Sequence, residues 1–340
     1  MILKKQSAFI INISFVMAKI QKKQIITDFF HIILLKNIFF TMISFPIRTK
    51  VVFLQIKKIK IMEWYEKYLS IYEKPFSEVP QKVIDQTHEQ LTALQSANPL
   101  ISIIIVAYNE EKHLQACLWS LSDIKCKYPV EFIGVDNESK DRTAEIYQKS
   151  GIPYYTEHQH TCGYARQCGL NHAKGKYAMC IDSDTIYPPY YFDIMVENLM
   201  KPGISAVAAM WSFYPTEIHP KLKLKLYEFF RDIYIRLQNI NRPELSVRGL
   251  AFGYETENAK KEGYRVELLR GEDGSMALAM KKYGKIKFVY DHRCRVITGY
   301  GSLKETMIKK AIWNRLKFYG VSRLFYKTDH YIDEEDNILK

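Results

Sequence analysis

The chain has 340 residues, and its formal net charge of +12 suggests at first a nucleic-acid or membrane partner. The excess lies in residues 1–61, which hold 11 Lys and Arg against one acid, Asp28, a net charge of +10, so only +2 remains for the other 279 residues. This nearly neutral body excludes a basic nucleic-acid footprint there. The six cysteines form no CxxC pair, which is typical of reduced cytosolic thiols.

Three interpretations stay open for residues 1–61, a basic apolar extension. Residues 29–47 are an apolar stretch long enough for a membrane anchor, but Lys36 in its middle is costly at a bilayer centre. Residues 1–18 have the basic start and apolar run of a signal peptide, without a small-x-small cleavage site. The third interpretation is a mis-assigned start: translation begins at Met62, where the composition becomes that of an ordinary mixed helix.

The remaining chain divides by pattern into three parts. Residues 62–98 predict a helical leader of two amphipathic helices, with Pro75 and Pro80 between them. Residues 99–296 alternate between strand and helix patterns and form the predicted main domain. Residues 297–340 predict a basic helical segment and an acidic tail.

The main domain begins with LISIIIVA, a continuous β-branched run typical of a strand buried on both faces in a parallel sheet. Strands are predicted at 100–107, 130–135, 152–155 and 176–181, and helices at 111–121, 141–147 and 163–173. This alternating order predicts an α/β fold with a doubly wound, mainly parallel sheet. The loops at the carboxyl ends of its strands then form the site.

The strand at 176–181 stops on two carboxylates, Asp182 and Asp184. Residues two apart on an extended chain point the same way, so these like charges repel each other unless a cation lies between them. Oxygen ligands on a loop suit Mg²⁺ or Mn²⁺, which complete their coordination shell with substrate phosphates. A lone D-x-D is more often a turn followed by a helix cap, so the other strand ends must distinguish the two interpretations.

Two common nucleotide-binding motifs are missing. No predicted strand is followed by GxGxxG, which removes the main support for a nicotinamide or flavin site. Residues 169–176, GLNHAKGK, have one residue too many for a P-loop, and Tyr177 stands where Ser or Thr must bind the metal.

The strand ends that remain are AYNEE, VDNESKDRT and DSD, and in this order they resemble glycosyltransferase family 2, enzymes of the GT-A fold that transfer a sugar from a nucleotide donor. The resemblance covers about residues 99–296. It implies that Tyr108 and Glu110 line the base pocket and that Asp136 and Asn137 read the base edge and ribose. In the family the second residue of this pair is an acid, and here it is Asn137.

The resemblance also implies the phosphate side of the site. Asp182 matches the carboxylate nearer the ribose and sugar, and Asp184 matches the one that binds the metal bridging the diphosphate. Arg166 stands where the family often keeps a basic residue near the phosphates or the sugar. The alternative for Arg166 is an ordinary solvated helix residue.

Residues 270–274, RGEDG, match the family's ED motif with Glu272 and Asp273, just before a helix predicted at 275–283. The resemblance implies that Asp273 is the catalytic base, which takes the acceptor's proton on the face opposite the leaving diphosphate. The alternative is a helix cap. Upstream, residues 248–252, RGLAF, resemble the acceptor-side strand, and Trp211 either shapes the acceptor pocket or is a core residue.

Two segments are basic and apolar together. Residues 222–237 carry an apolar stripe flanked by Lys and Arg, which either packs on the core or lies on an anionic membrane beside a lipid-linked acceptor. Residues 304–327 are a second basic, aromatic segment. Together they predict peripheral membrane contact.

The sequence therefore predicts an inverting, metal-dependent glycosyltransferase with a UDP-sugar donor and a polysaccharide, glycolipid or similar acceptor, placed in the cytoplasm at the inner face of the membrane. The processive motif Q-x-x-R-W is absent, with IWNR at 312–315 nearest to it, which favours addition of a single sugar. One alternative is a sugar nucleotidyltransferase, which needs a Gly-rich first loop that AYNEEKH does not offer. The other is a non-catalytic sugar-nucleotide-binding module, which the DSD and ED motifs disfavour.

Overall fold

The structure is a computed structural model that describes residues 63–300. The predictions for the extension at 1–61 and for the basic segment at 304–327 fall outside the described residues.

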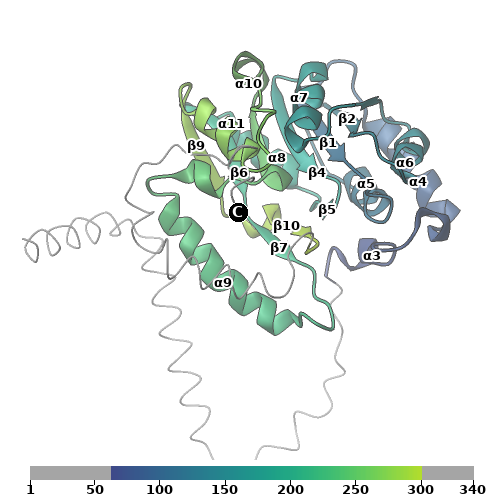
Figure 1. Cartoon of the computed structure of the whole chain (residues 1–340). Helices are drawn as coiled ribbons and strands as arrows, with labels where there is room; N and C mark the ends of the chain where they lie inside the picture. The colour runs from purple at the N-terminus through teal and green to yellow at the C-terminus, as the bar shows by residue number, and fades with distance from the viewer. Residues whose placement is uncertain (1–62, 301–340) are drawn as a thin grey trace, which may run out of the picture. The chain divides into compact units, whose positions relative to one another are not determined.

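A mixed sheet of seven strands forms the centre of the described part, in the order β3-β2-β1-β4-β8-β6-β9 (Figure 1). β8 is antiparallel to both of its neighbours, and all other adjacent pairs are parallel. The predicted mainly parallel α/β sheet is confirmed. The strands are β1 Ile101–Ala107, β2 Val130–Asp136, β3 Tyr154–Thr156, β4 Tyr177–Asp182, β6 Ile204–Ala209, β8 Phe252–Glu255 and β9 Lys285–Val289.

A small second sheet follows β4 directly. It has the order β5-β10-β7, with β5 Thr185–Ile186, β7 Trp211–Phe213 and β10 Val296–Thr298. Thr298 pairs with Thr185, so the end of the described chain lies beside the DSD segment. β10 also crosses the domain boundary predicted at residue 296.

Helices cover both faces of the main sheet (Figure 1). Successive residues of β1 point to opposite sides, so that Ile103 and Ile105 enter one core and Ile104 and Val106 the other. This explains why the strand sequence is apolar without alternation. The helices are α3 Glu66–Leu69, α4 Gln81–Leu94, α5 Leu114–Ser122, α6 Thr143–Ser150, α7 Cys162–His172, α8 Tyr191–Leu199, α9 Lys221–Gln238, α10 Thr256–Glu262 and α11 Glu272–Met280.

Three local predictions differ from the structure. The first leader helix is a single turn, α3, because the chain turns at Glu73, whose φ is 65°, before Pro75. The helix predicted at 275–283 is α11, which begins earlier, at Glu272. Glu272 and Asp273 therefore lie in its first turn, where the helix dipole stabilises negatively charged side chains. The strand predicted at 248–252 is a 3₁₀ turn, Gly249–Ala251, that leads into β8.

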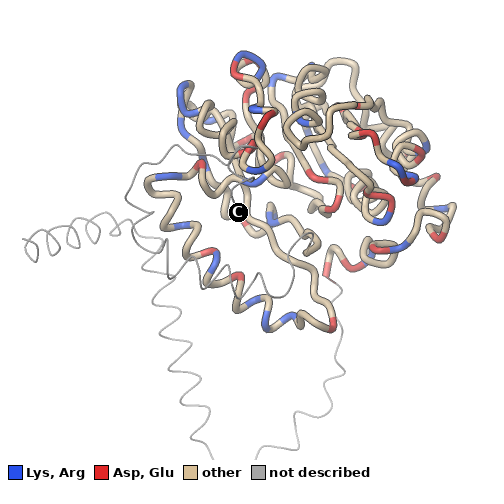
Figure 2. The backbone as a smooth tube through the Cα atoms, in the orientation of Figure 1, with Lys and Arg blue, Asp and Glu red and all other residues tan. Residues whose placement is uncertain are grey.

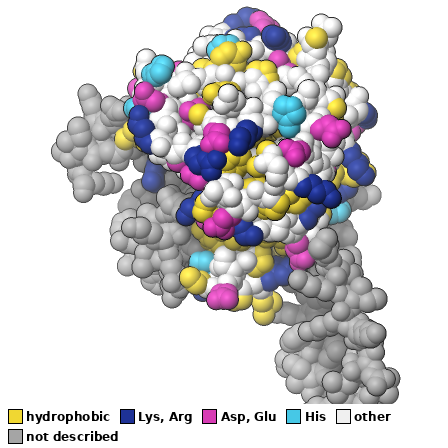
Figure 3. Space-filling view, turned by 90° about the vertical axis from the view of Figure 1, so that its right-hand side faces the viewer, with side chains coloured by type: hydrophobic (Ala, Val, Ile, Leu, Met, Phe, Trp, Pro, Cys, Tyr) yellow, Lys and Arg dark blue, Asp and Glu magenta, His cyan; other side chains and the backbone are white. Residues whose placement is uncertain are grey.

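Figure 3 shows one face of the molecule, and on it the described residues form a surface of mixed charge. Acidic and basic side chains are interspersed on that face of the described residues rather than gathered by sign.

Helix α7 and strand β1 are in close contact at Gly169. A methyl group added at Gly169 would lie 2.2 Å from Cγ2 of Ile104, within the packed core. Gly169→Ala should therefore lower the free energy of unfolding by about 1–3 kcal/mol, because overpacking outweighs the gain of about 1 kcal/mol in helix propensity. Urea unfolding measures the change. Asn171→Ala on the exposed side of α7 is the control, with a change of about 0.5 kcal/mol or less, and a Gly169→Ala protein more stable than wild type would contradict the packing argument.

Candidate active site

Two cavities meet at the carboxyl end of β4. The larger has a volume of about 630 Å³ and is lined from β1, α7 and the start of α11. The smaller, of about 310 Å³, is lined from β7, α9 and the residues after β10. Both are lined by Asp182, Asp184, Arg248 and Leu250. A ligand in one cavity therefore meets a ligand in the other at the two aspartates.

Most of the predicted site residues come together at the larger cavity. Asp136 is the exception, since it is buried, accepts a hydrogen bond from the backbone N–H of Ser139 (3.2 Å) and does not line the cavity. Residues that do line it are Tyr108, Glu110, Asn137, Arg166, Asp182, Asp184, Glu272 and Asp273.

Arg166 joins three carboxylates from two elements. Its Nη2 donates to Oδ1 of Asp182 (2.8 Å), and its Nε lies 3.0 Å from Oδ1 of Asp273 and 3.5 Å from Oε1 of Glu272. The side chain is only 2% exposed. The alternative of a solvated helix residue is therefore wrong, and Arg166 fixes the ends of β4 and α11 relative to each other.

The turn at Gly249 leaves the room that Arg166 occupies. A Cβ built there would lie 1.8 Å from Nη2 of Arg166 and 2.7 Å from Oδ2 of Asp273. A side chain at Gly249 would thus displace either the guanidinium or the carboxylate. The segment RGLAF alone did not predict that its glycine leaves room for Arg166.

Burial raises the pKa of Asp273 to about 7, against the opposing effect of Arg166, and Glu272 and Asp182 add to the rise. A carboxylate with a pKa near neutrality can accept a proton at neutral pH and release it again. Asp273 therefore has the proton affinity of a general base and lies in the wall of the larger cavity.

Asp184 also has a raised pKa of about 7, first because it is buried and then because the charges of Asp182 and Glu110 lie close. Its Oδ1 accepts a hydrogen bond from Oγ1 of Thr185 (3.1 Å). Within residues 63–300, no group of three His, Cys, Asp or Glu side chains could hold a metal ion. The pair Asp182 and Asp184 fits an ion that takes the rest of its shell from phosphates and water, as Mg²⁺ does.

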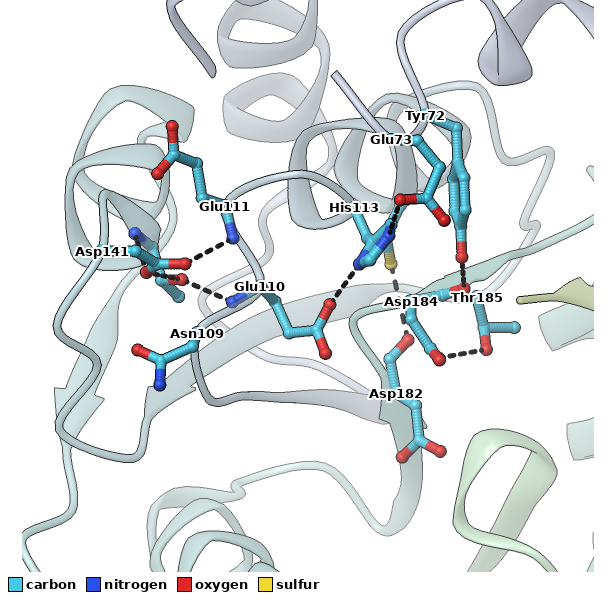
Figure 4. A network of polar contacts seen from close by, with 12 residues as sticks. Tyr72, Glu73, Asn109, Glu110, Glu111, His113, Asp141, Asp182, Asp184 and Thr185 are labelled. Carbon is cyan, nitrogen blue, oxygen red and sulfur yellow. Dashed lines mark hydrogen bonds and ion pairs between the residues drawn. The ribbon is translucent and has the colours of Figure 1, made fainter. Parts of the chain in front are cut away.

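The leader contributes to the site, which the sequence did not predict (Figure 4). The hydroxyl of Tyr72 donates to the backbone oxygen of Asp184 (2.7 Å), and its ring lies 4.7 Å from that of His113. His113 lies between Glu110 (2.6 Å) and Glu73 (3.2 Å). Burial lowers the pKa of His113, but the two glutamates outweigh it and the pKa is raised, so His113 is suited to carry positive charge between them.

Hydrogen bonds join the loop after β1 to the loop after β2, beside the larger cavity (Figure 4). The side chain of Asn109 accepts a hydrogen bond from the backbone N–H of Lys140 (2.8 Å), and the backbone N–H of Glu111 donates one to the side chain of Asp141 (3.0 Å). Asn109 has a φ of 54°. Glu138, with a φ of 57°, is a second non-glycine residue in the left-handed region. Such conformations persist only where the surroundings fix them, and here they position Glu110.

The amide of Asn137 holds the loop that precedes α7. Its Nδ2 donates to the backbone oxygens of Glu157 (3.0 Å) and Gln159 (2.7 Å). An aspartate has no hydrogen to donate at this position, which gives a physical reason for Asn137 in place of the second acid. The same loop carries His160, whose ring lies 6.1 Å from that of the half-exposed Tyr108, and both line the larger cavity.

Asn137→Asp tests this contact. The carboxylate would face two carbonyl oxygens, so the free energy of unfolding should fall by about 1–3 kcal/mol. Urea unfolding is the measurement. The control is Asn171→Asp, because Asn171 accepts from Gln167 and an aspartate can still accept. Equal stability of Asn137→Asp and wild type would show that the amide does not hold this loop.

The raised pKa of Asp184 predicts how metal affinity depends on pH. A cation binds the ionised carboxylate, so below the pKa of about 7 a proton must leave first. The association constant of Mn²⁺, measured by calorimetry with UDP present, should fall about tenfold from pH 8 to pH 6. Asp184→Asn should bind Mn²⁺ weakly at every pH. A flat profile for the wild type would show that Asp184 does not bind the ion.

The sequence of this chain is similar to those of known glycosyltransferases. Residues 102–254 match the family model described as glycosyl transferase family 2. An uncharacterized glycosyltransferase of Rickettsia prowazekii is 33% identical over 106 residues, 31% of this chain and 33% of that protein. The poly-beta-1,6-N-acetyl-D-glucosamine synthase of Staphylococcus epidermidis is 30% identical over 150 residues, 41% of this chain and 33% of that protein. The chain thus spans about a third of the length of these relatives.

Among solved structures, the mannosyltransferase PcManGT from Pyrobaculum calidifontis, in complex with GDP-Man and Mn²⁺, is 16% identical with a TM-score of 0.47 and covers 70% of this chain and 69% of its own. The family match ends before Glu272 and Asp273, so the position of these two residues is known from the geometry alone.

Proposed function

We propose that this chain, which belongs to glycosyltransferase family 2 through its residues 102–254, is an inverting, metal-dependent, non-processive transferase that adds a single sugar. The donor is a nucleotide sugar, with a UDP-sugar favoured by the resemblance described above. The acceptor is a glycan or a lipid-linked molecule. The synthase of Staphylococcus epidermidis makes a polysaccharide by its name, which supports an acceptor of this kind.

The observation that carries the proposal is the meeting of the two cavities at Asp182 and Asp184, with Asp273 in the wall of the larger one. The larger cavity has the volume and the polar strand-end loops to take the nucleotide sugar. Tyr108, Glu110 and Asn137 would contact its base and ribose. The smaller cavity would take the acceptor.

Asp184 and Asp182 would hold the divalent ion, which when bound neutralises charge on the leaving diphosphate. Burial first and then the charge of Asp182 raise the pKa of Asp184, and the repulsion between the two carboxylates favours binding of a cation at the pair. Arg166 keeps Asp182 in place through its hydrogen bond and ion pair.

In the reaction, the acceptor oxygen forms a bond to the anomeric carbon while the bond from that carbon to the diphosphate oxygen breaks. The hydroxyl proton passes to the carboxylate of Asp273, and the nucleoside diphosphate leaves with the electron pair. Attack from the face opposite the leaving group inverts the anomeric configuration. Arg166 orients Asp273 and offsets the charge of its ionised form.

A screen of nucleotide sugars tests the proposal against its alternatives. A donor at 100 times its dissociation constant should stabilise the protein by about 2.7 kcal/mol, read as a rise in melting temperature that needs Mn²⁺. Release of UDP with free sugar, without acceptor, would exclude a non-catalytic binding module. Formation of a nucleotide sugar from a nucleoside triphosphate and a sugar phosphate would instead assign the chain as a nucleotidyltransferase.

Asp273→Asn separates the proposed base from the metal site. The amide keeps the size of the side chain but accepts no proton, so transfer at saturating donor and acceptor should fall by about 10² to 10⁴ while donor affinity persists. Asp184→Ala should instead lose metal-dependent donor binding. Transfer by Asp273→Asn within a few-fold of wild type, together with a loss in Glu272→Gln, would move the base to Glu272.

A further inference from the structure

Helix α9 carries a stripe of exposed apolar side chains. Leu222 is 82% exposed, Leu226 60% and Phe230 61%. The exposed residues at three- and four-residue spacing are Leu222, Leu226, Phe229, Phe230, Ile233 and Leu237. Of the two alternatives left open for this stripe, packing on the core is therefore wrong. An exposed apolar stripe of this kind marks an interaction surface.

Basic side chains border the stripe, and the acids of α9 turn inward. Lys223 and Lys225 are exposed, and Figure 2 shows Lys and Arg along this helix. Glu228 accepts hydrogen bonds from Ser212 and from the N–H of Phe213, both on β7. Asp232 forms ion pairs with Arg231 and Arg295. The outer face thus combines leucine, isoleucine and phenylalanine with lysine.

The inner side of the same helix lines the smaller cavity through Tyr227, Arg231, Tyr234, Ile235 and Gln238. That cavity ends at Asp182 and Asp184. One helix therefore has the proposed acceptor cavity on one side and the apolar stripe on the other.

We propose that α9 lies on an anionic lipid surface, with its apolar stripe among the acyl chains and its lysines at the lipid phosphates. This orientation brings the smaller cavity to the membrane, where a lipid-linked acceptor would enter it. The nature of the acceptor rests on the proposed function, whereas lipid docking does not.

Charge distinguishes this occupant from the other two candidates. A second copy of the chain would bring the lysines of its own α9 against this stripe in a twofold contact. Residues 304–327 of the same chain hold seven Lys and Arg and one acid, so they too bring like charge. An anionic membrane offers both the apolar interior and the opposite charge.

Vesicle sedimentation of the full chain tests the proposal, with phosphatidylcholine vesicles that do or do not contain phosphatidylglycerol. Wild type should bind the anionic vesicles. The double variant Leu226→Glu/Phe230→Glu should bind them at least about tenfold more weakly, and Lys223→Glu/Lys225→Glu should lose about fivefold for each lysine. Met200→Glu, an exposed apolar position directly after α8, is the control and should bind like wild type.

Binding of wild-type strength by both double variants would overturn the proposal and assign lipid contact to residues outside α9. Failure of the wild type to bind would also overturn it. In that case light scattering identifies the occupant: a dimer that Leu226→Glu/Phe230→Glu makes monomeric points to a second copy, and a monomer throughout points to the basic segment 304–327 of the same chain. Hydrolysis of the UDP-sugar without vesicles should be equal in all variants, and its absence from every chain would count against the proposed function alone.

Discussion

The buried guanidinium of Arg166 is the interaction on which the site depends. It lies among Asp182, Glu272 and Asp273, which come from the ends of β4 and α11. Three carboxylates so close together would repel one another, and loss of the one cation among them would leave uncompensated buried charge at a cost of about 3–5 kcal/mol. The absence of a side chain at Gly249 is the complementary requirement, since the guanidinium packs against that backbone. A helix, a strand end and a turn are thus fixed at one point.

Burial raises the pKa of two carboxylates of the site, Asp273 and Asp184, to about 7, but the charges around the two groups differ. Burial raises the pKa of Asp273 and Arg166 opposes the rise, so this group stays close to a balance between its two protonation states. For Asp184, burial and the charge of Asp182 act in the same direction. In the proposed function, Asp273 takes the proton of the acceptor and Asp184 binds the cation, so the two carboxylates have separate functions within one cavity.

The strand ends and their order could be predicted because each strand is a short apolar run closed by polar residues, and parallel strands bring such ends to one edge. The sequence could not show that Tyr72 reaches the backbone of Asp184, since 112 positions separate them and no local pattern links them. It also could not show that Asp136 caps its own turn instead of lining the cavity. The burial of Arg166 depends on Gly249 and on carboxylates from α11, contacts that exist only in the fold.

Periodicity predicted the stripe of α9 but not the side it faces. Polar contacts and two buried apolar residues, Leu224 and Ile235, hold the helix to the domain. Arg231 donates to the backbone oxygen of Trp211 (2.5 Å) and lies 4.6 Å from its ring, and Asp232 pairs with Arg295. Burying a leucine or phenylalanine stabilises a fold by roughly 1.5–3 kcal/mol, so an inward stripe would have been the more stable choice for a domain with no partner. Helix α9 instead buries Leu224, Arg231 and Ile235 and leaves Leu222, Leu226 and Leu237 exposed, so that the apolar area of these three leucines stays available for a second surface. On α9 this surface lies directly behind the cavity that ends at the two aspartates.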